Sequence, residues 1–357
     1  MLGLTPVEPL PGQLLQSGLP LQVAGRSIAA IGLNLFYVVQ SYRIETSRVG
    51  DSGDPLILVD AGRCQAINQL AAAGHMLAYV VTAPAGPSAA IGGCGAPGVV
   101  SWSIWLLDLN GGRPRQVAAG TRLPDSIDAA EYPTHVAISD SAYAFDREAD
   151  AKAHAKGSIV EVHSLDGRLL WTSQSPAPVA NVMLGGNRLA VTTEAGAAAG
   201  PMVLWIADAA HPTPDQTAMP ASSASMSLDG SWVVWDLQPY LPTPAGTHRS
   251  AVGIEALDSG RITSLNAVTG SDVAAPIRPS ISLTRAGPAI AWFATAPGGA
   301  VYPAFRFAGG GDGGILESVQ QPVWLEVQGS SLIWVAASPD GWSTTAYAVD
   351  LLTLASG

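Results

Sequence analysis

Two aspartates occupy the same position in an internal repeat, where a carboxylate could hold a cation or transfer protons. Asp146 and Asp236 each stand six residues after a turn residue, at the expected exit of a strand. Carboxylate oxygens suit Ca²⁺, which takes roughly six to eight oxygen ligands. Paired carboxylates are also the groups that hydrolyse glycosides, and Asp146, Glu194 and Asp236 could supply such a pair. Acids on exposed loops are more often simply solvated. We therefore expect no cofactor, with a Ca²⁺ site as the alternative.

Other residues with binding chemistry fall in stretches that we expect to be long loops. The candidate partner-binding residues are Asp146, Arg147, Glu148, Glu194, Asp236, Tyr240, His248, Arg249 and Trp342. The six histidines form no H-E-x-x-H pattern, and the chain has no G-x-S-x-G turn. These patterns favour recognition over catalysis, so we expect no catalytic residue.

The chain has two cysteines, Cys64 and Cys94, which allow one disulfide. We expect Cys64 near a turn between the third and fourth strands of its unit and Cys94 in a loop between the second and third strands. Such connections leave opposite faces of a sheet, whereas a disulfide needs Cα atoms within about 7 Å. The alternative is two free thiols that pack as small hydrophobes.

These residues must be positioned by a pattern that occurs seven times. A Gly or Asp ends one short apolar stretch, and the residue five positions later lies within a second. The pairs are Gly32 and Tyr37, Gly74 and Tyr79, Asp140 and Phe145, Gly186 and Val191, Gly230 and Trp235, Gly287 and Trp292, and Gly329 and Trp334. A recurrence of paired strands at this spacing is typical of radial or stacked repeat proteins.

Repeated four-stranded antiparallel units predict an all-β, seven-bladed β-propeller, which closes without a free edge. We expect residues 1–13 to form an N-terminal tail and residues 14–357 a single propeller domain. An N-terminal strand between Leu14 and Val23 is expected to complete the last blade. Trp235, Trp292 and Trp334 are expected in the core between blades, because a buried aromatic side chain removes a large apolar area from water. Trp342 is the exception and stays a candidate binding residue.

Loop lengths predict which face of this propeller carries the functional site. The expected loops between second and third strands are long, at 40–55, 82–101, 146–157 and 236–250, and so are the links at 118–133 and 266–279. Both kinds of connection leave the same face of a propeller. Because binding residues concentrate on loops held by a rigid scaffold, we place the site on this face.

Composition excludes two classes of function. The net charge of −11 leaves no basic patch for nucleic acid, and no stretch approaches the roughly 18 apolar residues of a membrane span. The first twelve residues lack the charged and apolar regions of a signal peptide but are similar to the Pro-rich tether that follows a cleaved one. An extracytoplasmic location (periplasmic, cell-surface or secreted) is expected, with a cytoplasmic one as the alternative.

The segment Ser227–Trp235, with sequence SLDGSWVVW, resembles the TolB-type propeller repeat, and Ile138–Phe145 is a weaker copy. Leu165–Trp171 resembles a quinoprotein-type blade. These resemblances imply the fold, and propellers carry many unrelated functions. The sequence predicts a non-enzymatic scaffold whose long-loop face docks a protein partner or a glycan. The alternatives are a carbohydrate-active hydrolase or lyase with acids at the channel mouth and a structural subunit of a larger surface assembly.

Overall fold

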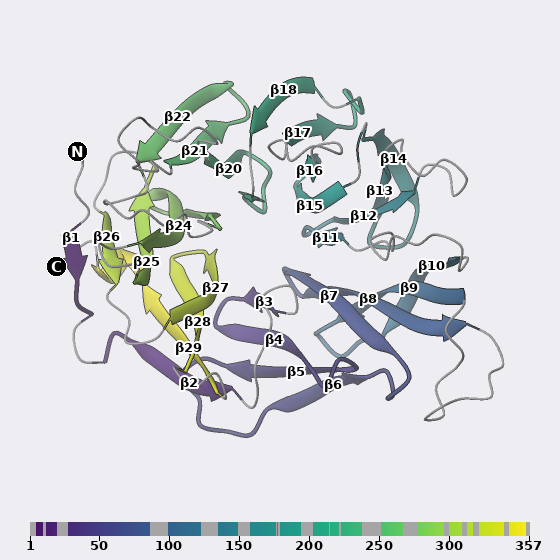
Figure 1. Ribbon diagram of the computed structural model, residues 1–357, viewed down its shortest axis with the longest axis horizontal. Coiled ribbons are helices and arrows are strands. Elements are labelled where there is room, and N and C mark those ends of the chain that lie inside the picture. The colour runs from purple at the N-terminus through teal and green to yellow at the C-terminus, as the bar shows by residue number, and fades with distance from the viewer. Residues whose placement is uncertain are drawn as a thin grey trace.

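The structure is a computed structural model of the chain. It describes residues 5–9, 12–19, 28–85, 99–122, 135–148, 158–175, 177, 179–193, 203–213, 215–220, 223–237, 251–266, 278–295, 300–308, 313–316, 321–338 and 343–354. Within these ranges the strands form seven sheets arranged in a ring about a central axis (Figure 1). The expected seven-bladed β-propeller is therefore confirmed.

In blades one to six, four antiparallel strands follow chain order from the axis outward, and in blade seven three do. Blade one has β3 (Ile28–Ile31), β4 (Asn34–Val39), β5 (Arg43–Arg48) and β6 (Leu56–Asp60); blade two has β7 (Ala66–Ala73), β8 (Met76–Ala85), β9 (Val99–Asp108) and β10 (Arg115–Arg122). Blade three has β11 (Val136–Ile138), β12 (Ala142–Glu148), β13 (Ser158–Ser164) and β14 (Leu169–Gln174); blade four has β15 (Val179–Gly185), β16 (Arg188–Thr193), β17 (Val203–Asp208) and β18 (Asp215–Pro220).

The remaining blades follow the same order. Blade five has β19 (Ala224–Met226), β20 (Trp232–Leu237), β21 (Ala251–Ala256) and β22 (Arg261–Asn266); blade six has β23 (Ser280–Thr284), β24 (Gly287–Thr295), β25 (Val301–Phe307) and β26 (Gly313–Leu316). Blade seven has β27 (Gln321–Gln328), β28 (Ser331–Ala337) and β29 (Thr344–Asp350), after which a short helix α1 (Leu351–Leu354) follows. No helix in the described ranges is long and apolar enough to cross a membrane.

The N-terminal segment closes the ring. Strand β2 (Leu15–Leu19) pairs antiparallel with β29, which supplies the fourth strand of blade seven as the sequence predicts. A second strand, β1 (Thr5–Val7), pairs parallel with β26 and gives blade six a fifth strand. This strand lies within the stretch that we expected as an N-terminal tail.

Aromatic side chains of the repeat fill the space between blades. Trp235, Trp292 and Trp334 expose 1%, 1% and 2% of their surface, which confirms that they belong to the core. Tyr37 and Tyr79 occupy the same place in their blades and are equally buried. Burying a large aromatic group at each blade interface stabilises the ring, because roughly 150–250 Å² is removed from water for each side chain.

Blade one differs from the prediction. The stretch 40–55, expected as one long loop, contains strand β5, and β6 is a full outer strand. The turn before β5 is tight because Gln40 and Ser41 adopt positive φ angles of 55° and 68°. The Tyr42 hydroxyl donates to Gln40 Oε1 at 2.6 Å across this turn. Such angles usually belong to glycine and are rare in other residues. Because Gln40 and Ser41 make this turn, no glycine in the sequence indicated the hairpin.

Candidate functional site

The long connections leave one face of the propeller, as the sequence predicts. Residues 86–98 connect β8 to β9, residues 149–157 connect β12 to β13, and residues 238–250 connect β20 to β21. The second and fourth strands of an antiparallel blade end at the same edge, so the links between blades leave from this face too. We call it the long-loop face. The turns between first and second strands lie on the opposite face, here called the turn face.

Several candidate residues lie outside the part of the chain that the structure describes. They are Glu194, Tyr240, His248, Arg249, Trp342 and Cys94. Glu148 is the last residue of β12, and its side chain also lies outside that part. The structure therefore places three of the candidates on the long-loop side with their side chains: Asp146, Arg147 and Asp236.

Asp146 and Asp236 are repeat-equivalent but buried, not exposed on loops as we expected. The amide of each donates to the carbonyl of the residue that precedes the first strand of its blade: His135 at 3.4 Å and Ser223 at 2.9 Å. Asp146 also accepts the His135 amide at 3.0 Å, and its second oxygen lies 3.4 Å from His135 Nδ1. The fractional exposures are 5% for Asp146 and 0% for Asp236. These carboxylates thus stand behind the long-loop face and not on its surface.

Arg147 is exposed and belongs to a charged cluster on blade three. Its Nε donates to Glu161 Oε1, and Glu161 Oε2 lies 3.0 Å from Nε2 of His163. The His163 ring stacks on Tyr143, with centroids 5.2 Å apart. Burial opposes the charge of Glu161, but the hydrogen bonds from His163 and Arg147 outweigh it and lower the pKa of this carboxyl. The cluster therefore holds Arg147 in place.

Sequence reasoning missed Glu161 and His163. The signal is the antiparallel register of β12 and β13, which sets Phe145 opposite Glu161 and Tyr143 opposite His163. Counting outward from the turn at 165–167 would have found both residues. In the described ranges, no three His, Cys, Asp or Glu side chains are grouped so that they could hold a metal ion.

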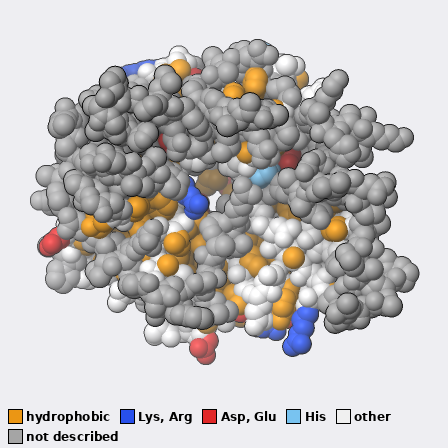
Figure 2. Space-filling model, viewed as in Figure 1, with side chains coloured by type: hydrophobic (Ala, Val, Ile, Leu, Met, Phe, Trp, Pro, Cys, Tyr) orange, Lys and Arg blue, Asp and Glu red, His pale blue; other side chains and the backbone are white. Residues whose placement is uncertain are grey.

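A central channel of about 340 Å³ runs where the first strands of all seven blades meet. Figure 2 shows one face of the molecule hollowed near the axis, with hydrophobic side chains inside the hollow. Many residues of its described lining are apolar in type, but the surface that faces the channel is largely polar and includes amides and hydroxyls from residues such as Asn181, Ser225 and Gln328. Glu326, on β27, is the one ionisable residue of that described lining.

The environment of Glu326 changes its acidity. The Glu326 side chain lines the channel and is partly accessible. Desolvation raises its pKa from 4.5 to about 7, against a smaller opposing effect of the hydrogen bond from Gln328. A carboxyl with such a pKa changes its charge near neutral pH.

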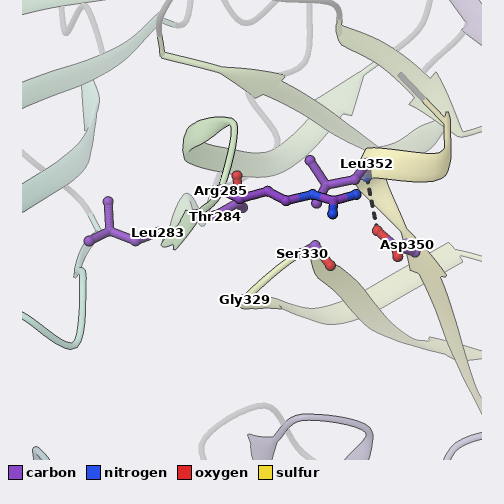
Figure 3. A pocket seen from close by; sticks show the side chains of 7 residues that line it. All are labelled: Leu283, Thr284, Arg285, Gly329, Ser330, Asp350 and Leu352. Carbon is purple, nitrogen blue, oxygen red and sulfur yellow. Dashed lines mark hydrogen bonds between the residues drawn. The ribbon is translucent and has the colours of Figure 1, made fainter. Parts of the chain in front are cut away.

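A second pocket, of about 440 Å³, lies on the turn face between blades six and seven. It is lined by Leu283, Thr284, Arg285, Gly329, Ser330, Asp350 and Leu352. Figure 3 shows Arg285 extended across it toward the start of α1, where the Leu352 amide donates to Asp350 Oδ1 at 2.9 Å. Gly329 belongs to the repeat pattern, and none of the candidate binding residues predicted from the sequence lies here.

Cys64 is disulfide-bonded. It lies between β6 and β7, not at a turn between third and fourth strands as expected, because β6 is the fourth strand of its blade. The link that carries Cys64 and the β8–β9 connection that carries Cys94 thus leave the same face. The geometric objection to a Cys64–Cys94 bridge is thereby removed.

Comparisons with known proteins show the fold alone. No protein-family model matches the sequence, and no curated protein matches it. Among solved structures, the β-propeller domain of the Trilobed protease from Pyrococcus furiosus is 12% identical, with 77% of this chain and 78% of that chain covered and a TM-score of 0.51. The computationally designed Ika8 protein is also 12% identical, covering 94% of this chain and 100% of that chain, with a TM-score of 0.51. An acylaminoacyl peptidase from Pyrococcus horikoshii is 10% identical over 88% of this chain and 49% of that chain, with a TM-score of 0.54.

Proposed function

We propose that the protein is a non-enzymatic scaffold whose long-loop face docks a protein partner. The observation that carries the proposal is the one-sided elaboration of the ring. Two-residue turns such as 32–33 and 329–330 join strands on the turn face, whereas residues 86–98 and 238–250 extend the long-loop face. Long connections on a rigid closed ring suit recognition, because the ring fixes their ends while their sequences vary freely.

The charged residues near this face support a polar interface. Arg147 is exposed, and Glu161 and His163 anchor it from the neighbouring strand. Tyr240, His248 and Arg249 lie within 238–250 and add an aromatic ring and basic groups, which are residue types that interfaces favour. A side chain held in place loses less conformational entropy on binding than a free one. We therefore assign the central contact to blades three and five.

An extracytoplasmic location is part of the proposal. The disulfide at Cys64 supports it, since such bonds persist mainly in oxidising compartments. The similarity of blade five to the TolB-type repeat agrees with a propeller that binds other molecules.

The test compares four forms of the full chain: wild type, a variant with 238–250 shortened, Arg147→Glu, and a control with the turn-face connection 309–312 shortened. Each form is used to capture proteins from an extract of the source organism, and the captured protein is then purified and its affinity measured. We expect binding by wild type and control, and a loss of at least tenfold in the other two variants.

Equal affinity of all four forms would contradict docking on this face. A glycan array with the same four forms distinguishes the second kind of partner: glycan binding that depends on 238–250, without any captured protein, would replace the protein partner by a glycan. Binding lost only in the 309–312 variant would move the site to the turn face.

A further inference from the structure

We propose that the central channel binds a small organic cation, a primary ammonium, and that Glu326 is its counter-charge. The inference concerns the axis of the ring and does not depend on docking at the long-loop face. It follows from the shape of the channel, the composition of its wall and the position of one carboxylate.

Glu326 faces the channel because of the alternation of β27. Its neighbours Leu325 and Val327 are buried, with exposures of 8% and 2%, and pack between blades six and seven. Glu326 and Gln328 are partly accessible and line the channel. The Gln328 amide donates to Glu326 Oε1, which holds the carboxylate toward the axis and uses one of its two oxygens.

No basic residue belongs to the described channel lining; Arg278, which precedes the lining residue Pro279, donates to the Val323 carbonyl at 3.0 Å. All other described lining residues are neutral. A partly desolvated carboxylate with no cation in the described lining is costly to ionise, and an opposite charge within a few ångströms favours its ionised form. A cation that enters the channel would therefore gain a strong partner and relieve the desolvated carboxylate.

The wall selects an organic monocation over a metal ion. Divalent cations such as Ca²⁺ need several oxygen ligands, commonly including more than one carboxylate, and this wall offers one. The wall surface that faces the channel is largely polar, and Asn181 and Ser225 are among the residues that offer hydrogen-bond acceptors. A volume of about 340 Å³ accommodates roughly ten water-sized groups. A small alkylammonium ion matches the size of the channel, its hydrogen-bonding wall and its single charge.

The test measures binding of n-butylammonium to the full chain by isothermal titration calorimetry, with n-butanol as the neutral probe of the same shape. At pH 8 we expect n-butylammonium to bind and n-butanol to bind at least tenfold more weakly. At pH 6 the affinity for n-butylammonium should fall by about tenfold, because protonated Glu326 offers no charge. The uptake or release of protons is read from the dependence of the heat on the buffer.

Two variants locate the site. Glu326→Gln keeps the shape and polarity of the side chain and should lose at least tenfold in affinity at pH 8. Glu255→Gln is the matched control, since Glu255 is also half-buried with a pKa raised by desolvation but lies on β21, away from the channel lining. Circular dichroism establishes that both variants are folded.

Four results would each overturn the proposal: no binding of n-butylammonium to wild type at millimolar concentration and pH 8, equal binding of n-butanol, unchanged binding to Glu326→Gln, or equal losses in the two variants. Loss of binding confined to Glu326→Gln, together with the decline toward pH 6, supports it.

Discussion

Large aromatic residues of the repeat are matched by the size of the residue across the strand. Trp235 faces Gly253 on β21, and a Cβ atom on this glycine would lie 2.2 Å from the indole Cε2. Trp334 faces Tyr347 instead, and the two rings stack with centroids 5.2 Å apart and planes 14° apart. Blade packing therefore depends on pairs of residues and not on the repeat aromatic alone.

Replacing Gly253 by Ala should destabilise the protein by about 1–3 kcal/mol, because the added methyl group would force the Trp235 ring out of its packed position. Equilibrium unfolding in urea measures the difference. Gly18→Ala is the control, since Gly18 also lies in a strand and a Cβ there would meet nothing within 4 Å. Equal free energies of unfolding for the two variants would contradict the packing argument.

At the scale of elements, strands were predicted well where glycine marks the turn and poorly where no residue type marks a turn or a strand end. Hairpins with glycine, such as the one at Gly329, were predicted correctly, whereas the turn at Gln40 and Ser41 was missed because no residue type marks it. Asp146 and Asp236 were assigned the right repeat position and the wrong exposure. Both residues were expected to leave the strand for a loop, but their amides still bond to His135 and Ser223 of the same blade, so the second strand continues through them.

Strand β2 holds the first and last blades together partly through Ser17. Its Oγ accepts the Gly50 amide at 2.8 Å and donates to the Asp51 carbonyl at 3.1 Å, both in the β5–β6 connection of blade one. Ser17→Ala should lower the free energy of unfolding by about 1–3 kcal/mol, because a partly buried N–H loses its partner. Ser259→Ala, on an exposed turn, should change it by less than about 0.5 kcal/mol. A smaller effect at Ser17 than at Ser259 would show that closure does not use this contact.

The connections of blades one and two are expected to be tied by a disulfide between Cys64 and Cys94, the two cysteines of the chain. Alkylation of the unreduced, urea-unfolded protein should modify neither thiol, and mass spectrometry after proteolysis should recover the linked peptides. The double variant Cys64→Ser, Cys94→Ser should be less stable by about 3–4 kcal/mol, since the cross-link restricts the unfolded chain. Two alkylated thiols without prior reduction would refute the bridge.

The whole ring creates an environment that no single blade has. Seven first strands meet at the axis, and together they desolvate Glu326. In the sequence, Glu326 is one acid among many and lies in a strand of ordinary alternating pattern. Periodicity predicted the ring and its core, because both repeat in every blade. The channel carboxylate occurs in one blade, so its role could emerge only when the ring was assembled.

The pH dependence of stability tests this property of the whole molecule. The raised pKa of Glu326 means that the folded state binds the proton more tightly than the unfolded state, so this group lowers stability as pH rises from 4.5 to about 7. Glu326→Gln should therefore be more stable than wild type at pH 8, by roughly 3 kcal/mol at most since each pKa unit is worth about 1.4 kcal/mol, and equal to it near pH 4.

Glu161→Gln should show the opposite dependence of stability on pH. The pKa of Glu161 is lowered by His163 and Arg147 despite burial, so its contribution is present at pH 8 and is lost as pH falls through the folded-state pKa. Urea unfolding of wild type and both variants at several pH values measures these differences, and parallel curves for wild type and Glu326→Gln would show that the channel carboxylate is not desolvated by the ring.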